Sequence, residues 1–514
     1  MMKNGNLSFY EIYPTSFYDS NGDGIGDIKG IIKKLDYVKS LGFKGIWFNP
    51  FFLSNFKDGG YDIIDFKKID PKFGTNADAY RLIKECHKRG LLVIFDLVAG
   101  HMSWDSPYFK DSAKSKMNKN SSMFIWTDSA WTWDSDYAVV RGLYDRDGAF
   151  MVNFFVHQPA LNYGFNKITR PWQQKTTDEG PKKTRDFIVD VMKFWCSKGV
   201  DGYRCDMADS LVKNDTDNKD ATQECWRYMF GEVRKEYPNM IAVSEWSNPH
   251  QSLSGGFDMD FVLDHQSNFS YAFFRKGYEY ESDGKMHGQP LFEKFDQELY
   301  DTAIKDLVYR IKEQEDKPGH YLAPISGNHD TFRIADSLKG DDLKLAYLFL
   351  FTMPGIPFVF AGDEGMQTTR RGYPSKDGGF QRTGTRFVMN WDKSMKNHGF
   401  SKTDGPLYLP YNNKDKDIES QIKDETSLLN LIKALNKLRD ANEDLTKHDG
   451  FELLDKPLSY RRGKTLIAMN LKDEPMEIDL KPGLLELSIG SIEVKENNKK
   501  MGNYKSGRIG GKKR

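Results

Sequence analysis

The chain has 514 residues, which is too long for one ordinary globular domain and long enough for a large barrel with an appended domain. Its 74 lysine and arginine residues balance its 74 aspartate and glutamate residues, which argues against a general nucleic-acid binder and against electrostatic docking on an anionic membrane. No apolar run is long enough to cross a membrane, no signal-peptide pattern opens the chain, and the four cysteines show no CxxC spacing, so we expect a cytoplasmic protein with reduced thiols.

Short apolar runs rich in β-branched and aromatic residues alternate with amphipathic helical stretches. The expected helices include 28–42, 77–90 and 183–199, and several end in a basic residue and a glycine, as helix C-termini commonly do. The expected strands cover 7–13, 45–52, 91–98, 200–207, 240–246, 260–266, 321–326 and 357–362. Near-continuous apolar strands that alternate with helices form a parallel sheet covered on both faces. Eight such strands predict a (β/α)8 barrel, the TIM barrel of the α/β class.

Two segments interrupt this alternation. Residues 101–165 follow the third expected strand, are rich in aromatic residues and lack a helical period, so they are predicted to form an inserted domain over the barrel mouth. Near the end, alternating patterns predict a small β-sandwich-like domain over 446–496, and the glycine- and lysine-rich stretch 497–514 is expected to be a flexible tail. The barrel would then comprise residues 1–100 and 166–445.

A turn with oxygen-bearing residues at every second position follows the first expected strand. The positions are Asp19, Asn21, Asp23, Ile25 and Asp27. Counted from Asp19, they match positions 1, 3, 5, 7 and 9 of a calcium loop, with a backbone carbonyl at Ile25, but Gly30 stands where such a loop has its bidentate glutamate. A solvated turn is the alternative interpretation.

Charged and polar residues gather at the carboxyl ends of the expected strands, the end at which barrels of this type carry their chemistry. They are Asp96 and His101 after the third strand, Arg204 and Asp206 on the fourth, Glu245 on the fifth, and Asn328, His329 and Asp330 after the seventh. A single acid at such a position commonly caps the next helix. Four strands that bring acids to one rim favour a catalytic site, because converging carboxylates raise one another's pKa.

Glycoside hydrolysis needs such an arrangement, with one carboxylate ionised and one carboxylic acid protonated. Arg204 lies two residues before Asp206 and therefore on the same face of the strand, where its charge would keep Asp206 ionised. The rival chemistry for acids and histidines is a metal centre, but the sequence has neither an HxH nor an HExxH spacing.

These strand ends carry a family resemblance. FDLVAGHMS (95–103), GYRCDMAD (202–209), SEW (244–246) and SGNHDTFR (326–333) resemble the four conserved regions of the α-amylase family of retaining glycosidases, and HQPALNYGF (157–165) resembles its fifth. Four further segments resemble the oligo-1,6-glucosidase-like branch of that family. They are FYDSNGDGIGDIKGI (17–31), GYDIIDFKKIDPKFGT (60–75), MPGIPFVFAGDE (353–364) and RTGTRFVMNWDKSMKNHGFS (382–401).

The resemblance implies roles for the matching positions. Asp206 falls on the nucleophile, Glu245 on the general acid/base, and Asp330 on the third acid, which binds sugar hydroxyls and stabilises the transition state. The positions that match the subsite of the cleaved sugar are Tyr61, which stacks under it, and Arg204, His101 and His329. Asp96 matches an aspartate with a more structural role.

Two further site assignments depend on the resemblance. Asp58 and Arg386 match a pair that binds the non-reducing-end hydroxyls in exo-acting relatives, with a loop cap and a surface ion pair as the alternative interpretation. The branch also has a structural Ca²⁺ or Mg²⁺ at the loop from Asp19 to Asp27, and we assign that cation to stability.

The implied activity is that of an exo-acting, retaining α-glucosidase on short α-glucosides. A glucosyl-transferring or isomerising relative, of the trehalose synthase or sucrose isomerase type, and an α-amylase are the alternatives. A non-catalytic, transporter-associated member would carry a transmembrane segment and lack the acids. The expected partner is a small oligosaccharide, without nucleic acid or membrane, and the chain is expected to be a monomer or a weak homo-oligomer.

The chain departs from the family pattern at three places. Gly100 stands where most relatives have an asparagine that ligates a different calcium in α-amylases. Asp209 and Ser210 replace a lysine–histidine pair of endo-acting relatives, which weakens the α-amylase interpretation. Met207 replaces a small residue that helps to separate α-1,6 from α-1,4 preference, so the linkage is not readable from the sequence.

Overall fold

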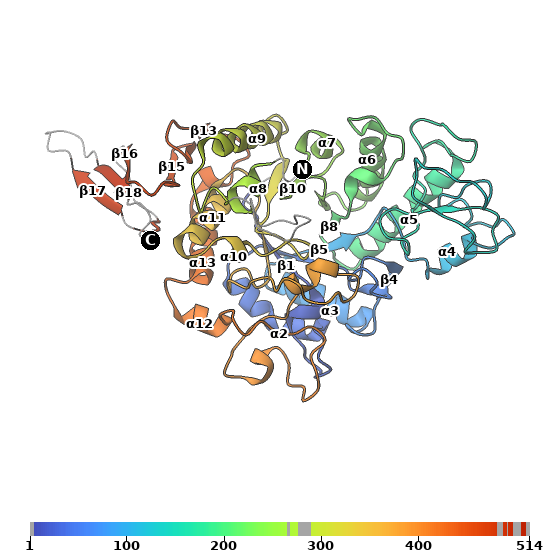
Figure 1. The fold of residues 1–514 in the computed structure, drawn as a ribbon, viewed down its shortest axis with the longest axis horizontal. Helices are drawn as coiled ribbons and strands as arrows, with labels where there is room; N and C mark the ends of the chain where they lie inside the picture. The colour runs from blue at the N-terminus through green and yellow to red at the C-terminus, as the bar shows by residue number, and fades with distance from the viewer. Residues whose placement is uncertain are drawn as a thin grey trace.

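An eight-stranded parallel sheet, curled into a barrel, forms the centre of the molecule (Figure 1). The structure is a computed structural model that describes residues 5–264, 268–275, 289–480, 487–490, 492–496 and 505–509. The strand order is β11-β10-β9-β8-β5-β2-β1-β12, and a parallel bridge between Ile325 and Phe358 brings the two ends of the sheet together. The predicted (β/α)8 barrel is confirmed.

Each barrel strand overlaps a stretch predicted from the sequence, and β10 begins one residue before its predicted start. The strands are β1 (Phe9–Ile12), β2 (Gly45–Phe48), β5 (Leu92–Leu97), β8 (Gly202–Cys205), β9 (Ile241–Ser244), β10 (Met259–Val262), β11 (Tyr321–Pro324) and β12 (Phe358–Phe360). The observed strands are shorter than predicted, because the residues that follow them leave the sheet to form the catalytic rim. Of the stretch predicted over 260–266, residues 265–267 lie outside the described residues.

Helices follow the strands and cover the outside of the barrel. The main ones are α2 (Ile28–Ser40), α3 (Asn76–Lys88), α5 (Glu179–Cys196), α6 (Asp220–Arg234), α9 (Gln297–Glu315), α11 (Gly340–Thr352) and α13 (Leu428–Ala441). Shorter ones are α1 (Pro14–Phe17), α7 (Pro249–Ser254), α8 (Phe269–Phe274), α10 (Ile334–Ser337) and α12 (Ile418–Lys423). Side-chain caps determine where several helices begin. Thr75 and Asp78 form a capping box at α3, and Asp27 caps α2 by accepting from the N–H of Gly30.

The alternation of side chains along the strands produces two separate cores. One fills the barrel interior with Phe9, Trp47, Ile94, Val243 and Phe261, among others. The larger core lies between the strands and the helices, and it contains the outward-facing residues of the same strands. Cys205 belongs to this outer core, as strand alternation predicts. The polar residues that end each strand therefore lie directly above a closed apolar plug.

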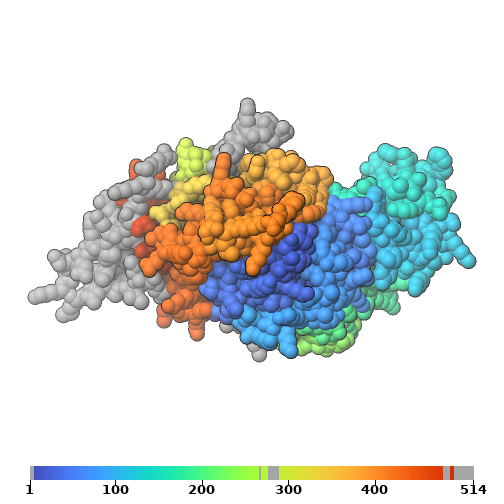
Figure 2. All heavy atoms as spheres, turned by 90° about the horizontal axis from the view of Figure 1, so that it is seen from below, coloured from blue at the N-terminus to red at the C-terminus, as the bar shows by residue number. Residues whose placement is uncertain are grey.

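The segment after β5 forms a lobe at one end of the molecule (Figure 2). It contains α4 (Pro107–Ser112) and a two-stranded sheet of β6 (Val139–Val140) and β7 (Phe150–Met151), and it buries a small apolar cluster of its own. A second excursion, the antiparallel pair β3 (Phe52–Ser54) and β4 (Ile63–Ile69), follows β2 and carries Asp58 and Tyr61 in its loop.

Two small antiparallel sheets follow α13, at the end of the molecule opposite to α4 (Figure 1). The first comprises β13 (Phe451–Leu453), β14 (Ser459–Arg462) and β15 (Thr465–Ala468), and the second has the order β16-β18-β17. The second sheet comprises β16 (Met476–Leu480), β17 (Ile492–Glu496) and β18 (Lys505–Ile509). Of the stretch 497–514, which is expected to be a flexible tail, only residues 505–509 are described, and there β18 pairs with β16 and β17; the rest lies outside the described residues.

Two composition-based expectations can be compared with the structure. The four cysteines are free and buried. No helix in the described part of the chain combines the length and the apolar character that a membrane span requires.

Candidate active site

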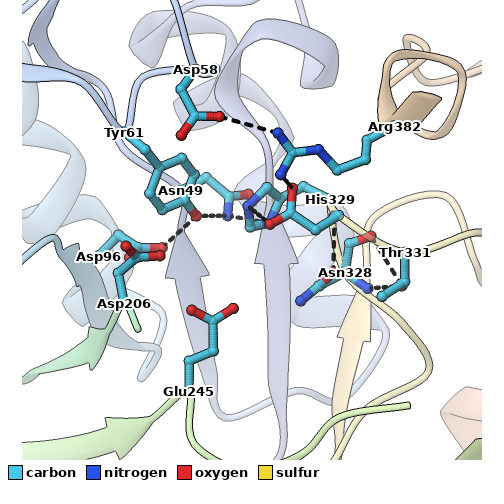
Figure 3. A network of polar contacts seen from close by, with 12 residues as sticks. Asn49, Asp58, Tyr61, Asp96, Asp206, Glu245, Asn328, His329, Thr331 and Arg382 are labelled. Carbon is cyan, nitrogen blue, oxygen red and sulfur yellow. Dashed lines mark hydrogen bonds and ion pairs between the residues drawn. The ribbon is translucent and has the colours of Figure 1, made fainter. Parts of the chain in front are cut away.

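One guanidinium group holds three carboxylates at the carboxyl end of the barrel. Arg204 Nη1 lies 2.9 Å from Asp96 Oδ1 and 2.9 Å from Asp206 Oδ1, and its Nη2 forms an ion pair with Glu245 Oε1. Figure 3 shows Asp96 and Asp206 side by side, with the Glu245 side chain directed toward them. The structure thus brings the predicted nucleophile and the predicted acid/base together on one cation.

The backbone at the end of β8 orients Arg204, Asp206 and Glu245 toward one another. Arg204 faces the barrel interior and places its head above the apolar plug, 5.1 Å from the centre of the Trp47 ring. Met207 adopts φ of 41° and ψ of 48°, a left-handed conformation that is costly for a residue with a side chain. In this conformation its N–H donates to Glu245 Oε2 at 2.9 Å. The strained residue therefore connects the two predicted catalytic acids.

Burial and crowding of negative charge govern ionisation on this side. Burial raises the pKa of Asp96 to about 6, and Arg204 opposes that shift. Burial, together with the charge of Glu245, raises the pKa of Asp206 well above its ordinary value, again against Arg204. Arg204 contacts Asp206 as predicted, but its charge alone does not return the pKa of that carboxyl to its ordinary range. Asp96 and Asp206 therefore bind a proton more readily than an exposed aspartate does.

The other side of the site is rich in arginine. Asp330 Oδ1 accepts from Arg382 Nη1 at 2.8 Å and from Arg386 Nη2 at 2.6 Å. Arg382 Nη2 also donates to Asp58 Oδ1 at 3.1 Å (Figure 3), so this guanidinium bridges Asp58 and Asp330. Burial opposes ionisation of Asp330, but His329, Arg382 and Arg386 together hold its pKa far below the ordinary value.

The expected ion pair between Asp58 and Arg386 is not formed. Arg386 is 2 % exposed and is committed to Asp330 and to the backbone carbonyl of His329, which its Nε reaches at 2.9 Å. Arg382, four residues earlier on the 3-10 helix η2 (Phe380–Thr385), makes the ion pair with Asp58 instead. Gln158 of the inserted segment donates to the other oxygen of Asp58 at 2.8 Å.

Tyr61 and His329 lie between the two sides. Their rings stack with centroids 5.1 Å apart and an angle of 7° between the planes. Tyr61 Oη donates to Asp96 Oδ2 at 3.0 Å and accepts from Asn49 Nδ2 at 3.2 Å. His329 Nδ1 lies 2.8 Å from Glu11 Oε1, and burial lowers the pKa of this histidine well below its ordinary value. The imidazole is therefore neutral.

His101 borders the site on the side of the inserted segment. Its Nε2 lies 3.2 Å from the carbonyl oxygen of Tyr61, and burial lowers its pKa to about 3. Its Nδ1 lies 3.3 Å from Asn153 Nδ2. A side chain at Gly100 would meet that same amide, because a Cβ there would lie 2.7 Å from it. Asn153 thus fills the space that the asparagine expected at position 100 would need.

Accessibility separates groups that can meet a substrate from groups that support them. The side chains of Arg204 and Asp96 are 0 % exposed, whereas those of Asp206, Glu245 and Asp330 are 10 %, 16 % and 30 % exposed. The three predicted catalytic acids are thus the carboxylates at the surface of this network, and Asp96 lies beneath them, in keeping with the structural role expected for it.

The predicted cation loop lies apart from these acids. The side chains of Asp19, Asn21 and Asp23 accept backbone N–H groups from residues two to five positions later, which winds the turn around their oxygen atoms. Asp27 instead accepts from Ser20 and caps α2. Within the described residues, no group of three or more His, Cys, Asp or Glu side chains is placed to hold a metal ion. The oxygens of Asp19, Asn21 and Asp23 thus serve the turn itself, and they do not form a converged set of cation ligands in this structure.

Sequence analysis missed five residues of the network. They are Glu11, Asn49, Asn153, Gln158 and Arg382. Glu11 lies near the end of β1 and Asn49 directly follows β2, and both could have been found by the reasoning used for Asp96. The other three come from long loops, and their contribution depends on contacts across the fold that no local pattern records.

The chain is similar to known proteins over most of its length. The family model described as the alpha amylase catalytic domain matches residues 11–448. The oligo-1,6-glucosidase of Heyndrickxia coagulans is 30 % identical, with 94 % of this chain and 95 % of that protein aligned. The oligo-1,6-glucosidase of Parageobacillus thermoglucosidasius is 31 % identical, with 89 % and 87 % aligned. The crystal structure of isomaltulose synthase from Klebsiella sp. LX3 shares the fold, with a TM-score of 0.77 at 21 % identity over 99 % of this chain and 97 % of that one.

Proposed function

Because this chain belongs to the α-amylase family, and is thus a glycoside hydrolase, we propose that it is an exo-acting, retaining α-glucosidase that hydrolyses short α-glucosides. The observation that supports this best is the pairing of Asp206 and Glu245 on one guanidinium. Retaining enzymes hold their two carboxyl groups about 5 Å apart, and inverting enzymes hold them farther apart to admit a water molecule. A shared cation favours the shorter separation.

In the proposed reaction, ionised Asp206 attacks the anomeric carbon while Glu245, as the acid, gives its proton to the leaving oxygen. Arg204 shields the two carboxyl groups from each other. After the first sugar leaves, Glu245 takes a proton from water, and that water releases glucose from the ester on Asp206. Asp330, kept ionised by Arg382 and Arg386, is suited to bind sugar hydroxyls and to stabilise positive charge at the anomeric centre.

The exo assignment is supported by the bridge across the site. Arg382 joins Asp58 to Asp330, and Gln158 joins Asp58 to the inserted segment. Charge-assisted bonds of this kind would close the subsite beyond a single sugar, so that a longer chain cannot continue through it. The proposed specificity is therefore for a terminal glucose unit.

Two measurements test this function. Proton NMR of the first product formed from an aryl α-glucoside should show α-glucose, and β-glucose would contradict retention. A maltoheptaoside blocked at its non-reducing end should resist cleavage, whereas rapid internal cleavage would contradict exo action. Product analysis with maltose and with isomaltose would assign the linkage, and trehalose or longer products would favour the glucosyl-transferring alternative.

We also propose a structural Ca²⁺ or Mg²⁺ in the loop that holds Asp19, Asn21 and Asp23, with a role in stability and none in catalysis. What supports it is the alternating spacing of Asp19, Asn21, Asp23, the Ile25 carbonyl and Asp27 along the sequence, although Asp27 caps α2 in the structure. A cytoplasmic location agrees with the four free cysteines. Size-exclusion chromatography with light scattering tests the expected monomer or weak homo-oligomer.

A further inference from the structure

His329 is fully buried, and its two ring nitrogens face different groups. Its side chain is 0 % exposed, and the rings of Tyr61 and Tyr13 stack on it, with plane angles of 7° and 3°. Its Nε2 faces Asp330 Oδ2 at 3.4 Å and has no hydrogen-bond partner among the described residues. Its Nδ1 faces the opposite way, toward Glu11 and Asn49. The two nitrogens thus meet different surroundings.

A chain of hydrogen bonds sets the orientation of the Asn49 amide. Tyr61 Oη donates its one hydrogen to Asp96 Oδ2 at 3.0 Å, so it must accept from Asn49. The nitrogen of the Asn49 amide therefore points to Tyr61, and the same nitrogen lies 2.9 Å from His329 Nδ1. An amide nitrogen has hydrogens and no lone pair to offer. A hydrogen on Nδ1 would face that N–H group, so Nδ1 must accept.

Glu11 meets the same nitrogen. Its Oε1 lies 2.8 Å from His329 Nδ1, and its side chain is 1 % exposed. A carboxylate oxygen facing a lone pair would repel it, whereas a carboxylic acid would donate to it. Burial raises the pKa of Glu11 well above its ordinary value, against hydrogen bonds from Asn49 and from the His329 backbone N–H and against the positive charge of Arg204. The setting therefore favours the neutral acid.

We propose that Glu11 and Asn49 are positioning residues that hold neutral His329 with its proton on Nε2, and that Glu11 does so as a carboxylic acid donating to Nδ1. This inference rests on the proposed function, in which Nε2 meets a hydroxyl of the cleaved sugar beside Asp330. The Nε2–H group would then donate to that hydroxyl, while ionised Asp330 accepts from its neighbours. An imidazole with its proton on Nδ1 would present a lone pair to the sugar instead.

Two substitutions distinguish donation by Glu11 from a role for its charge. Glu11→Gln keeps a hydrogen-bond donor without charge, and Glu11→Met keeps the approximate size without a donor. We expect Glu11→Gln to retain kcat/KM within about 3-fold and Glu11→Met to lose roughly 10- to 100-fold. A loss in Glu11→Gln as large as that in Glu11→Met, or full activity in Glu11→Met, would overturn the proposal.

A matched control is Glu364, which follows β12 and contacts Tyr10 on the outward face of β1. Glu364 is also buried, and it accepts from Tyr10 Oη and Tyr37 Oη at 2.6 Å each, away from the site. Glu364→Met should lower the melting temperature and leave kcat/KM unchanged. A loss of activity in this control equal to that in Glu11→Met would mean that any buried acid of the barrel has the same effect, and the proposal would fall.

The proton can also be located without substrate. In the full chain labelled with [¹⁵N]histidine, long-range ¹H–¹⁵N spectra distinguish the two neutral tautomers, and His329→Asn assigns the signal. We expect the Nε2–H tautomer in the wild type and in Glu11→Gln at neutral pH. An Nδ1–H tautomer or an imidazolium in the wild type would overturn the proposal even if the Glu11 variants fail to fold. Because this readout needs no turnover, a chain inactive on α-glucosides would contradict the proposed function and leave the tautomer result standing.

Discussion

The two sides of the site combine acids and guanidinium groups in different proportions. Around Arg204, one cation contacts three carboxylates, while on the other side Arg382 and Arg386 both contact Asp330, and Arg382 also contacts Asp58. The pKa of Asp206 is raised where acids outnumber the cation, whereas the pKa of Asp330 is lowered where one carboxylate meets two guanidinium groups and His329.

This contrast divides the chemistry between the two sides. The acid-rich side can keep one proton and pass it to a leaving group, which is the requirement for general acid catalysis. On the arginine-rich side Asp330 keeps its charge, which suits it to bind hydroxyls without exchanging protons, whereas burial raises the pKa of Asp58 against the charge of Arg382. The same residue type thus acquires two functions from the charge that surrounds it.

The largest expected effect is on the acid-rich side. Asp206→Asn preserves the shape of the nucleophile but removes its attacking oxygen charge, so kcat/KM should fall roughly 10⁴-fold or more. Glu245→Gln should be nearly as damaging for maltose or isomaltose but much less so for a dinitrophenyl α-glucoside, whose leaving group needs no proton. Steady-state kinetics with both substrates check this. Equal losses in Glu245→Gln on the two substrates would contradict its role as the acid.

A smaller effect is expected on the arginine-rich side. Arg382→Met removes the bridge between Asp58 and Asp330, so kcat/KM for a terminal glucoside should fall roughly 10- to 100-fold, mainly through KM. The blocked maltoheptaoside should then become a slow substrate, because the subsite is no longer closed. Arg370→Met provides the control, since Arg370 lies near the Tyr373 ring in the same loop region. A drop in kcat alone for Arg382→Met would argue against a binding role.

Removing one charge on each side should shift two pH profiles in opposite directions. Glu245→Gln deletes a negative charge that raises the pKa of Asp206, so that pKa falls. The acid limb of kcat/KM for the dinitrophenyl glucoside, where the nucleophile becomes protonated, should move to lower pH. Arg382→Met deletes a positive charge that lowers the pKa of Asp330, so loss of binding at acidic pH should begin at higher pH. Shifts in the same direction would mean that the two sides are not electrostatically distinct.

The smallest effect on activity is expected at the loop from Asp19 to Asp27, outside both sides of the site. Chelation should lower the melting temperature by a few degrees, because a ligand bound at 100 times its Kd adds about 2.7 kcal/mol to stability. Asp23→Asn should abolish the response, whereas Asp27→Ala should destabilise α2 by about 1 kcal/mol with or without cation. Calorimetry with added Ca²⁺ or Mg²⁺ checks both. A large change in kcat on chelation would contradict the separation of this loop from catalysis.

The sequence alone determined the barrel and the acids at its rim. Each strand is a short apolar run, and alternation by two residues places Arg204 and Asp206 on one face and Cys205 on the other. These patterns are local, since they depend on neighbours within one strand, and parallel strands of a barrel all end at the same rim. The approach of Asp206 to Glu245 follows from that topology.

Only the tertiary structure decided which partner each charged group obtained. Arg382 and Arg386 lie four residues apart in one motif. With the chain bent at η2, Arg382 contacts both Asp58 and Asp330, whereas Arg386 contacts Asp330. Asn49 acquires its orientation through Tyr61 from Asp96, a contact between the end of β2, the β3–β4 loop and β5. Likewise, the pairing of β18 with β16 and β17 joins segments that composition does not connect. Ionisation and hydrogen-bond direction depend on burial and on distances of a few ångströms between remote segments, and folding sets both.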